Sequence, residues 1–155
     1  METVMPYRFA PRLAAMAGAL LMMLPAHAAE AESPIGFWRN VSDKTGKVEA
    51  IIQIWEERGE LKGKLIKLFD TKDTVCTHCH DDKKDKPLVG LEIIWGVHQD
   101  GDEWNGGRIL DPESGDVYKV KMTMAEGGQK LNVRGFIGFS LLGRTQTWLR
   151  DAGAR

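Results

Sequence analysis

Residues 117–124, VYKVKMTM, alternate between the two faces of an extended chain. One face carries Tyr118, Val120, Met122 and Met124, and the other face is mainly polar. Successive side chains of a β-strand point to opposite faces, so this alternation indicates a strand with one buried side. A glycine-rich turn follows directly, which is typical of a connection between antiparallel strands.

Similar segments recur along the chain at fairly even spacing, separated by turn signals. In the segment 89–97, we expect Leu91, Ile93, Trp95 and Val97 to share one face. The whole pattern predicts eight strands, at residues 38–41, 48–55, 61–69, 89–97, 104–110, 117–124, 130–137 and 144–150. No helical period of 3.6 residues competes with this pattern after residue 28.

Eight antiparallel strands of this length can close on themselves, and closure removes the exposed sheet edges. We therefore predict an all-β fold, an eight-stranded antiparallel up-and-down β-barrel that forms one domain over residues 29–155. A polar loop at residues 70–87 interrupts the strand rhythm. A barrel of this size has room for its own side chains or for one small ligand.

The N-terminus has the three parts of a secretory signal peptide. Arg8 and Arg12 precede an apolar run of 12 residues at 13–24, and Pro25-Ala26-His27-Ala28 ends in small residues. A membrane-spanning helix needs about 20 apolar residues, so this run is too short to be an anchor. We predict cleavage after Ala28, with a cut after Ala31 as the alternative. The mature chain would be periplasmic or secreted, with no transmembrane segment.

The charge balance argues against a nucleic-acid partner. The chain has 21 Lys and Arg and 22 Asp and Glu; Arg8, Arg12 and Glu2 lie within residues 1–28, so 19 and 21 remain in the mature chain. A net charge of about −2 lacks the basic field that nucleic-acid binding requires.

The segment Cys76-Thr77-His78-Cys79-His80 allows four interpretations. It matches the C-x-x-C-H signature of c-type haem attachment, and Cys76, Cys79 and His80 could instead hold a metal ion. The C-x-x-C pair could be redox-active, or it could be a disulfide formed in an oxidising compartment. Metal ligands crowded into five residues do not easily surround one ion, and the polar flanks suit haem poorly. We expect the disulfide, and predict no cofactor or metal.

Three arginines and several aromatic residues are candidates for a ligand site. Arg108, Arg134 and Arg144 each lie beside a glycine, and any of them that points into the barrel would need a partner such as a ligand carboxylate or phosphate. The alternative is a surface or capping role. The aromatic residues that would line a ligand cavity, or would simply pack in the core, are Trp95, Trp104, Tyr118 and Trp148.

Motifs spread over the mature chain resemble the exported bacterial family of domain of unknown function 2147. They are GFW at 36–38, PLVGL at 87–91, WNGGRILDP at 104–112, GDVY at 115–118, VRGF at 133–136 and LGRTQTW at 142–148. The resemblance implies a calycin-like barrel, similar to lipocalins and fatty-acid-binding proteins, and implies no established activity. It also favours the disulfide, since members of this family often carry a Cys pair in this loop without the following His.

In lipocalin-like barrels, a G-x-W motif at the barrel base is capped by an arginine from the last strand. Gly36 and Trp38 match the motif. The arginine could be Arg144 or Arg150, since both lie on the last predicted strand and the sequence does not decide between them; we assign barrel closure to Gly36, Trp38 and Arg150, with Arg144 as the alternative. A guanidinium over an indole face contributes roughly 0.5–2 kcal/mol.

Two functional hypotheses follow. The leading one is an exported, non-enzymatic barrel that binds a small apolar or amphipathic ligand through Trp95, Arg108, Tyr118, Arg134, Arg144 and Trp148. The alternative is an envelope module whose barrel is filled by side chains and whose surface meets another protein. A lumen filled by Ile52, Ile93, Met122 and Val133 would favour the second hypothesis. No spacing of catalytic residues indicates an enzyme.

Overall fold

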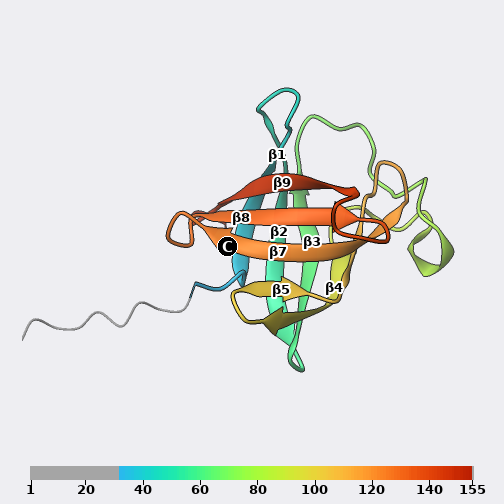
Figure 1. The fold of residues 1–155 in the computed structure, drawn as a ribbon. Coiled ribbons are helices and arrows are strands. Elements are labelled where there is room, and N and C mark those ends of the chain that lie inside the picture. Colours follow the sequence, from blue (N-terminus) through green and yellow to red (C-terminus); the bar gives the residue numbers. More distant parts are fainter. Residues whose placement is uncertain (1–31, 155) are drawn as a thin grey trace, which may run out of the picture.

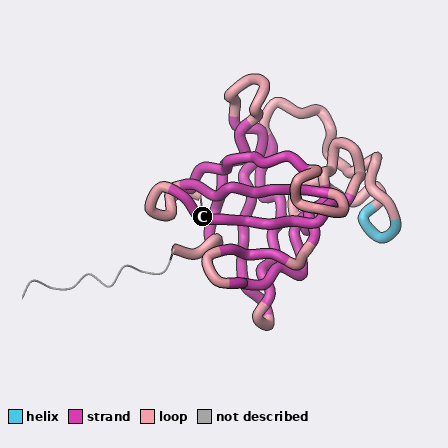
Figure 2. The backbone as a smooth tube through the Cα atoms, in the orientation of Figure 1, coloured by secondary structure: helices cyan, strands magenta, loops and turns pink. Residues whose placement is uncertain are grey.

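The computed structural model describes residues 32–154. The predicted signal peptide, residues 1–28, lies outside the described residues, as do residues 29–31 and 155. Between residues 32 and 154 there is one turn of 3₁₀-helix, η1 (Asp81–Lys83), and no helix long and apolar enough to span a membrane. The described chain consists otherwise of strands and loops (Figure 2).

The strands confirm the predicted all-β class. In chain order they are β1 (Gly36–Val41), β2 (Val48–Glu57), β3 (Glu60–Leu68), β4 (Glu92–Asp100), β5 (Glu103–Asn105), β6 (Arg108–Leu110), β7 (Val117–Ala125), β8 (Lys130–Phe136) and β9 (Gly143–Arg150). Figure 1 shows β7, β8 and β9 running across β1, β2 and β3, so that the two groups enclose the core between them.

The strands close into a barrel. Each strand pairs antiparallel with its neighbours, and β9 returns to pair with β1 through Trp38–Arg150 and Arg39–Leu149. Short β5 and β6 both lie between β4 and β7, so they occupy one position together and the ring has eight positions. The prediction of an eight-stranded antiparallel up-and-down barrel is confirmed.

The strand predicted at 104–110 is wrong in one respect, because it breaks into β5 and β6 at Gly106 and Gly107. Gly106 has φ +83°, a left-handed conformation that glycine adopts without steric cost. A Cβ atom on Gly107 would lie 2.4 Å from the carbonyl oxygen of Trp95 on β4. The two glycines therefore permit a local break in pairing together with a close backbone approach, a role that glycine often has within strands.

Side chains fill the lumen of the barrel. Ile52, Ile94, Met122, Leu131 and Trp148 are each at most 2% exposed and belong to one continuous apolar cluster. Side chains point inward at alternate positions along each strand, and paired residues on neighbouring strands point inward together, as Leu131 on β8 and Trp148 on β9 do. Fully burying a side chain of this kind contributes roughly 1.5–3 kcal/mol, so this interior is the main source of stability.

The topology gives the barrel two different ends. Neighbouring strands alternate in direction, so successive connections lie at opposite ends (Figure 1). The closed end has residues 33–35 and the β2–β3, β4–β5 and β7–β8 turns. The loop end has the β1–β2 turn, the long segment 69–91, the β6–β7 turn at 111–116 and the β8–β9 loop at 137–142.

Candidate functional site

The closed end is sealed by Trp38 and Arg150. Trp38 is fully buried, and its Nε1 donates a hydrogen bond of 2.7 Å to the carbonyl of Pro34. The Arg150 guanidinium lies 4.3 Å from the Trp38 ring centroid, which is cation–π geometry. Gly36, which has φ +133°, completes the contact, because a Cβ there would lie 3.0 Å from Nη1 of Arg150. The residues assigned to barrel closure lie together, whereas Arg144 lies at the loop end.

Arg150 also joins its own strand, β9, to two other segments of the closed end, residues 33–35 and the β7–β8 turn. Its guanidinium donates to the carbonyls of Ser33 at 2.8 Å, Ile35 at 3.1 Å and Gly128 at 2.5 Å. Partial burial lowers the pKa of Arg150, and the nearby Glu32 carboxylate opposes that effect. These hydrogen bonds hold residues 33–35 and the β7–β8 turn against β9, so Arg150 closes this end of the barrel.

The Cys76–Cys79 segment is packed against the loop end of the barrel. The two cysteines form a disulfide, and both are 1% exposed within the core cluster. The Sγ atom of Cys76 lies 3.5 Å from the carbonyl oxygen of Pro112 in the β6–β7 turn. Gly115, in the same turn, has φ +80°, and a Cβ there would lie 1.9 Å from the carbonyl oxygen of His78. The disulfide segment and the β6–β7 turn therefore touch backbone to backbone.

The loop predicted as polar at 70–87 thus has a buried apolar side. Most of its side chains are exposed, including His78 and His80, but the cysteines face the core and Leu88 follows at 6% exposure. Backbone hydrogen bonds between Cys76 and Lys86 and between Thr74 and Leu88 fold the segment on itself. No three His, Cys, Asp or Glu side chains among residues 32–154 are arranged to hold a metal ion.

The aromatic residues proposed to line a ligand cavity do not lie together. Trp148 is buried in the lumen, and Trp104 is also buried, whereas Tyr118 is half-buried at the start of β7, with its hydroxyl 3.4 Å from Asp116 Oδ2. Trp95 is half-buried and pairs in register with the exposed Arg108.

The predicted face of the segment 89–97 needs a correction at Trp95. Ile94 takes the fully buried position, and Gly96, at φ +67°, shifts the alternation before Val97. A bulge of this kind adds a residue to one strand and reverses which side chains face inward. The Trp95 ring instead lies under the Nζ atom of Lys83, 4.9 Å from its centroid.

None of the three candidate arginines is a buried cation. Arg108 is exposed, and Arg144 is exposed and bonded to Asp43 Oδ2 at 2.7 Å, a hydrogen bond that raises the pKa of Arg144. Arg134 is half-buried and donates to Thr145 Oγ1 and to the carbonyls of Ser140 and Leu141. Guanidinium groups keep their solvation at the surface, and these three arginines therefore match the surface alternative and not the inward one.

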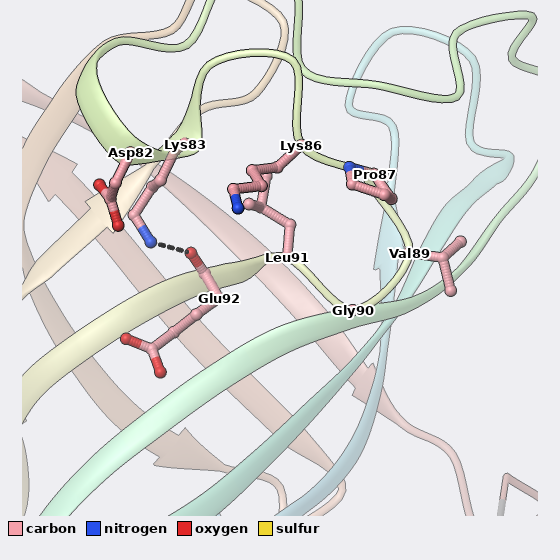
Figure 3. Close-up of a pocket in the computed structure, with 8 residues that line it drawn as sticks. All are labelled: Asp82, Lys83, Lys86, Pro87, Val89, Gly90, Leu91 and Glu92. Atoms are coloured by element: carbon pink, nitrogen blue, oxygen red, sulfur yellow. Dashed lines mark hydrogen bonds between the residues drawn. The ribbon is translucent and has the colours of Figure 1, made fainter.

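Two shallow hollows open on the outside of the protein. The first, of about 290 Å³, lies between η1 and the start of β4, where Lys83 donates to the carbonyl of Glu92 at 2.9 Å (Figure 3). The second, of about 400 Å³, lies at the β5–β6 break and is lined by Arg108, Lys119, Lys121 and Phe136 among others. Both are open to solvent, unlike the concave sites that enclose most of a small molecule.

The β8–β9 loop, residues 137–142, has the sequence IGFSLL and exposes its apolar side chains. Ile137, Phe139, Leu141 and Leu142 are 67%, 81%, 89% and 71% exposed. Residues 138–143 lie between the strands predicted at 130–137 and 144–150, and no functional role was predicted for them. The signal was available, because connections between strands are usually built from Gly, Pro, Asn, Asp and Ser and not from four large apolar residues.

The family model described as "Uncharacterized protein conserved in bacteria (DUF2147)" matches residues 36–150. The chain belongs to the DUF2147 family. This confirms the resemblance drawn from the sequence motifs. The match begins at Gly36 and ends at Arg150, so it spans the barrel from the first strand to the last.

The DUF2147 chain also resembles a solved structure. The protein HP1028 from the human pathogen Helicobacter pylori, described as belonging to the lipocalin family, matches with a TM-score of 0.69 and 16% sequence identity. The match covers 78% of this chain and 84% of that protein. At this identity the likeness shows a shared lipocalin-like fold. A search of curated proteins gives no match to the DUF2147 chain.

Proposed function

We propose that this protein is an exported, non-enzymatic binding module that meets its partner with the loop end of a side-chain-filled barrel. The filled lumen is the observation that supports the proposal. Ile52, Ile93, Met122 and Val133 are all at most 4% exposed, which is the pattern that favours the interaction module.

Close packing of the interior makes the binding of a ligand inside the lumen unfavourable. Protein interiors are packed as densely as organic crystals, so a ligand would have to displace several side chains that already fill the space. The indole of Trp148 and the side chains of Met122 and Leu131 lie in the middle of the barrel. The surface of the loop end, in contrast, is open and carries most of the exposed large apolar groups.

The disulfide supports an exported setting for this module. Disulfides persist in oxidising compartments such as the periplasm and are rare in the cytoplasm. Cys76 and Cys79 are the two cysteines of the chain, and they pair with each other.

A small amphipathic ligand is the second candidate function, favoured by the likeness to a lipocalin-family protein. Polar and half-buried side chains also interrupt the apolar core: Asn40 donates to Gln146 Oε1 at 3.0 Å, and Tyr118 lies at the start of β7. A ligand head group at the loop end would meet these side chains first.

Titration with a fluorescent fatty-acid analogue separates the two candidates. We expect no saturable binding of this analogue to the wild-type protein, and expect Met122→Ala, which opens only a small cavity in the lumen, to take up a molecule of the size of benzene but not the analogue. Urea unfolding of both proteins checks that the variant is folded. Saturable one-to-one binding to the wild-type protein would overturn the filled-barrel proposal.

A further inference from the structure

Exposed apolar residues gather at the loop end of the barrel. Of the seven large apolar side chains exposed among residues 32–154, six lie there and only Ile35 lies at the closed end. Val89 and Val117 belong to other segments, and the remaining four occupy the β8–β9 loop. This loop projects from one side of the barrel beyond the ends of β8 and β9 (Figure 1). A concentration of exposed apolar groups marks a surface that contacts something other than water.

The β8–β9 loop has its carbonyl groups satisfied from within the protein. The carbonyl of Gly138 accepts from Lys119 Nζ at 3.4 Å, and those of Ser140 and Leu141 accept from Arg134 at 2.6 and 3.3 Å. Two backbone hydrogen bonds, Leu142 N to Phe139 O and Ile137 N to Leu142 O, complete the set. All five carbonyls from 138 to 142 therefore have donors, which lowers the cost of moving these carbonyls out of water.

Cations without carboxylate partners lie next to the apolar loop. Residues 127–150 contain four Lys or Arg and no Asp or Glu; Arg134 and Arg144 lie toward this loop, whereas Arg150 and Lys130, which pairs with Glu126, lie at the closed end. Within the described chain, Arg108, Lys119 and Arg134 form no salt bridge, although Arg144 pairs with Asp43 and Lys121 with Glu103. Arg108, Lys119 and Phe136 line the same surface hollow, which connects the cations to the base of the loop.

Acidic side chains at the loop end belong to other segments. Asp111, Glu113 and Asp116 lie on the β6–β7 turn, and Asp81, Asp82 and Asp85 lie in or beside η1. The β8–β9 loop and its neighbouring cations are therefore the part of this end that a negatively charged surface would attract.

We propose that residues 137–142 insert into the interfacial layer of a bilayer containing anionic phospholipid. The Phe139 and Leu141 side chains enter the acyl boundary, while Arg108, Lys119 and Arg134 contact lipid phosphates. This rests on the proposed function and names the partner of the loop end. A bilayer accepts any projecting apolar tip, whereas a protein partner would need a pocket shaped to four side chains that point outward from one short loop.

Co-sedimentation with vesicles tests the proposal. The full mature protein is mixed with vesicles of phosphatidylethanolamine and phosphatidylglycerol, and with neutral phosphatidylcholine vesicles. We expect binding to the anionic vesicles that weakens as salt rises. The Phe139→Ser/Leu141→Ser double variant should bind at least about tenfold less, because two apolar side chains are lost from the acyl boundary. Ile35→Ser, which changes the exposed apolar residue of the closed end, is the matched control and should bind like the wild type.

A second measurement follows the tip of the loop itself. In Phe139→Trp, the added fluorescence should shift to the blue with anionic vesicles and be quenched by lipids brominated in the acyl chain. Equal sedimentation of the wild type and the double variant, or no quenching in Phe139→Trp, would overturn the membrane proposal and leave the filled barrel standing. Lipid carried into the supernatant in a one-to-one complex would overturn the filled barrel instead, because it would show a ligand site in the protein.

Discussion

The Arg150 guanidinium lies 4.3 Å from the centre of the Trp38 ring, although the two residues lie near opposite ends of the described chain. They also pair in register between β1 and β9, so the contact that seals the closed end is also part of the pairing that closes the strand ring. One residue pair therefore holds both the barrel wall and its base.

Arg150→Ala should lower the free energy of unfolding by about 2–4 kcal/mol, because it removes the cation–π contact and leaves three carbonyls without a charged donor. The matched variant Arg144→Ala removes an arginine of the same strand whose salt bridge to Asp43 is exposed, so its cost should stay below about 1 kcal/mol. Urea unfolding monitored by tryptophan fluorescence measures both. Equal costs for the two variants would contradict the closure role of Arg150.

The disulfide should hold the segment 69–91 on the barrel more than it stabilises the whole domain. The ring between Cys76 and Cys79 is short, so the chain-entropy model gives only about 2 kcal/mol. We expect Cys76→Ala/Cys79→Ala to remain folded by circular dichroism and to be cut faster by protease within residues 80–87. Identical cleavage of the variant and the wild type would show that the buried cysteines do not anchor this segment.

Gly115→Ala should separate the β6–β7 turn from the disulfide segment. An added Cβ would lie 1.9 Å from the carbonyl oxygen of His78, and backbone atoms on both sides would have to move. Gly101→Ala is the matched control, because its φ of +62° is also left-handed but nothing lies within 4 Å of its Cβ.

The control should cost about 1 kcal/mol in the free energy of unfolding, as expected for alanine at a left-handed position. Gly115→Ala should cost roughly 1–3 kcal/mol more, as overpacking does elsewhere. Denaturant unfolding of the two variants makes the comparison. A Gly115→Ala variant no less stable than Gly101→Ala would mean that the close contact does not exist in solution.

The Glu103–Lys121 pair should make stability depend on pH on the acid side. The hydrogen bond from Lys121, with a second from Asn105, lowers the pKa of Glu103 below its ordinary value of 4.5. As the pH falls, Glu103 therefore becomes protonated in the unfolded chain at a higher pH than in the folded protein. The contribution of the pair to the free energy of unfolding is present above pH 4.5 and is lost as the pH falls through the lowered pKa.

Thermal unfolding from pH 7 down to pH 3 measures this contribution. Glu103→Gln should lose less stability than the wild type over the acid part of that range, and Lys121→Met should resemble it, since each variant removes the pair. The Lys121 and Glu103 side chains are 37% and 31% exposed, so solvent and salt reach the pair, and the difference should be small and should shrink with salt. A wild-type profile identical to that of both variants would contradict the lowered pKa.

The sequence predicted the barrel because its strands alternate cleanly between apolar and polar residues. Residues 117–124 form most of β7, and Val120 and Met122 are buried as their positions require. The pattern failed at glycines. Gly96 and Gly106–Gly107 allow a bulge and a break, and neither can be seen in an alternation that assumes regular pairing.

The candidate site was harder to predict because its geometry depends on contacts between distant segments. Most residues around Cys76 and Cys79 are charged or polar, so the sequence does not show that one side of this segment is buried. That side is buried only through contact with the β6–β7 turn. Position next to glycine does not tell whether an arginine points into the lumen, and Arg134 instead binds carbonyls of the β8–β9 loop.

Native mass spectrometry of the protein purified from its own cell envelope tests the filled barrel most directly. We expect one dominant species with the mass of the mature chain, two hydrogens lighter than the reduced chain because of the Cys76–Cys79 disulfide. Mild activation of the ions should release nothing from it. A stoichiometric bound molecule that leaves only when the barrel unfolds would contradict the account, because Ile52, Met122 and Trp148 could not then occupy the lumen as they do here.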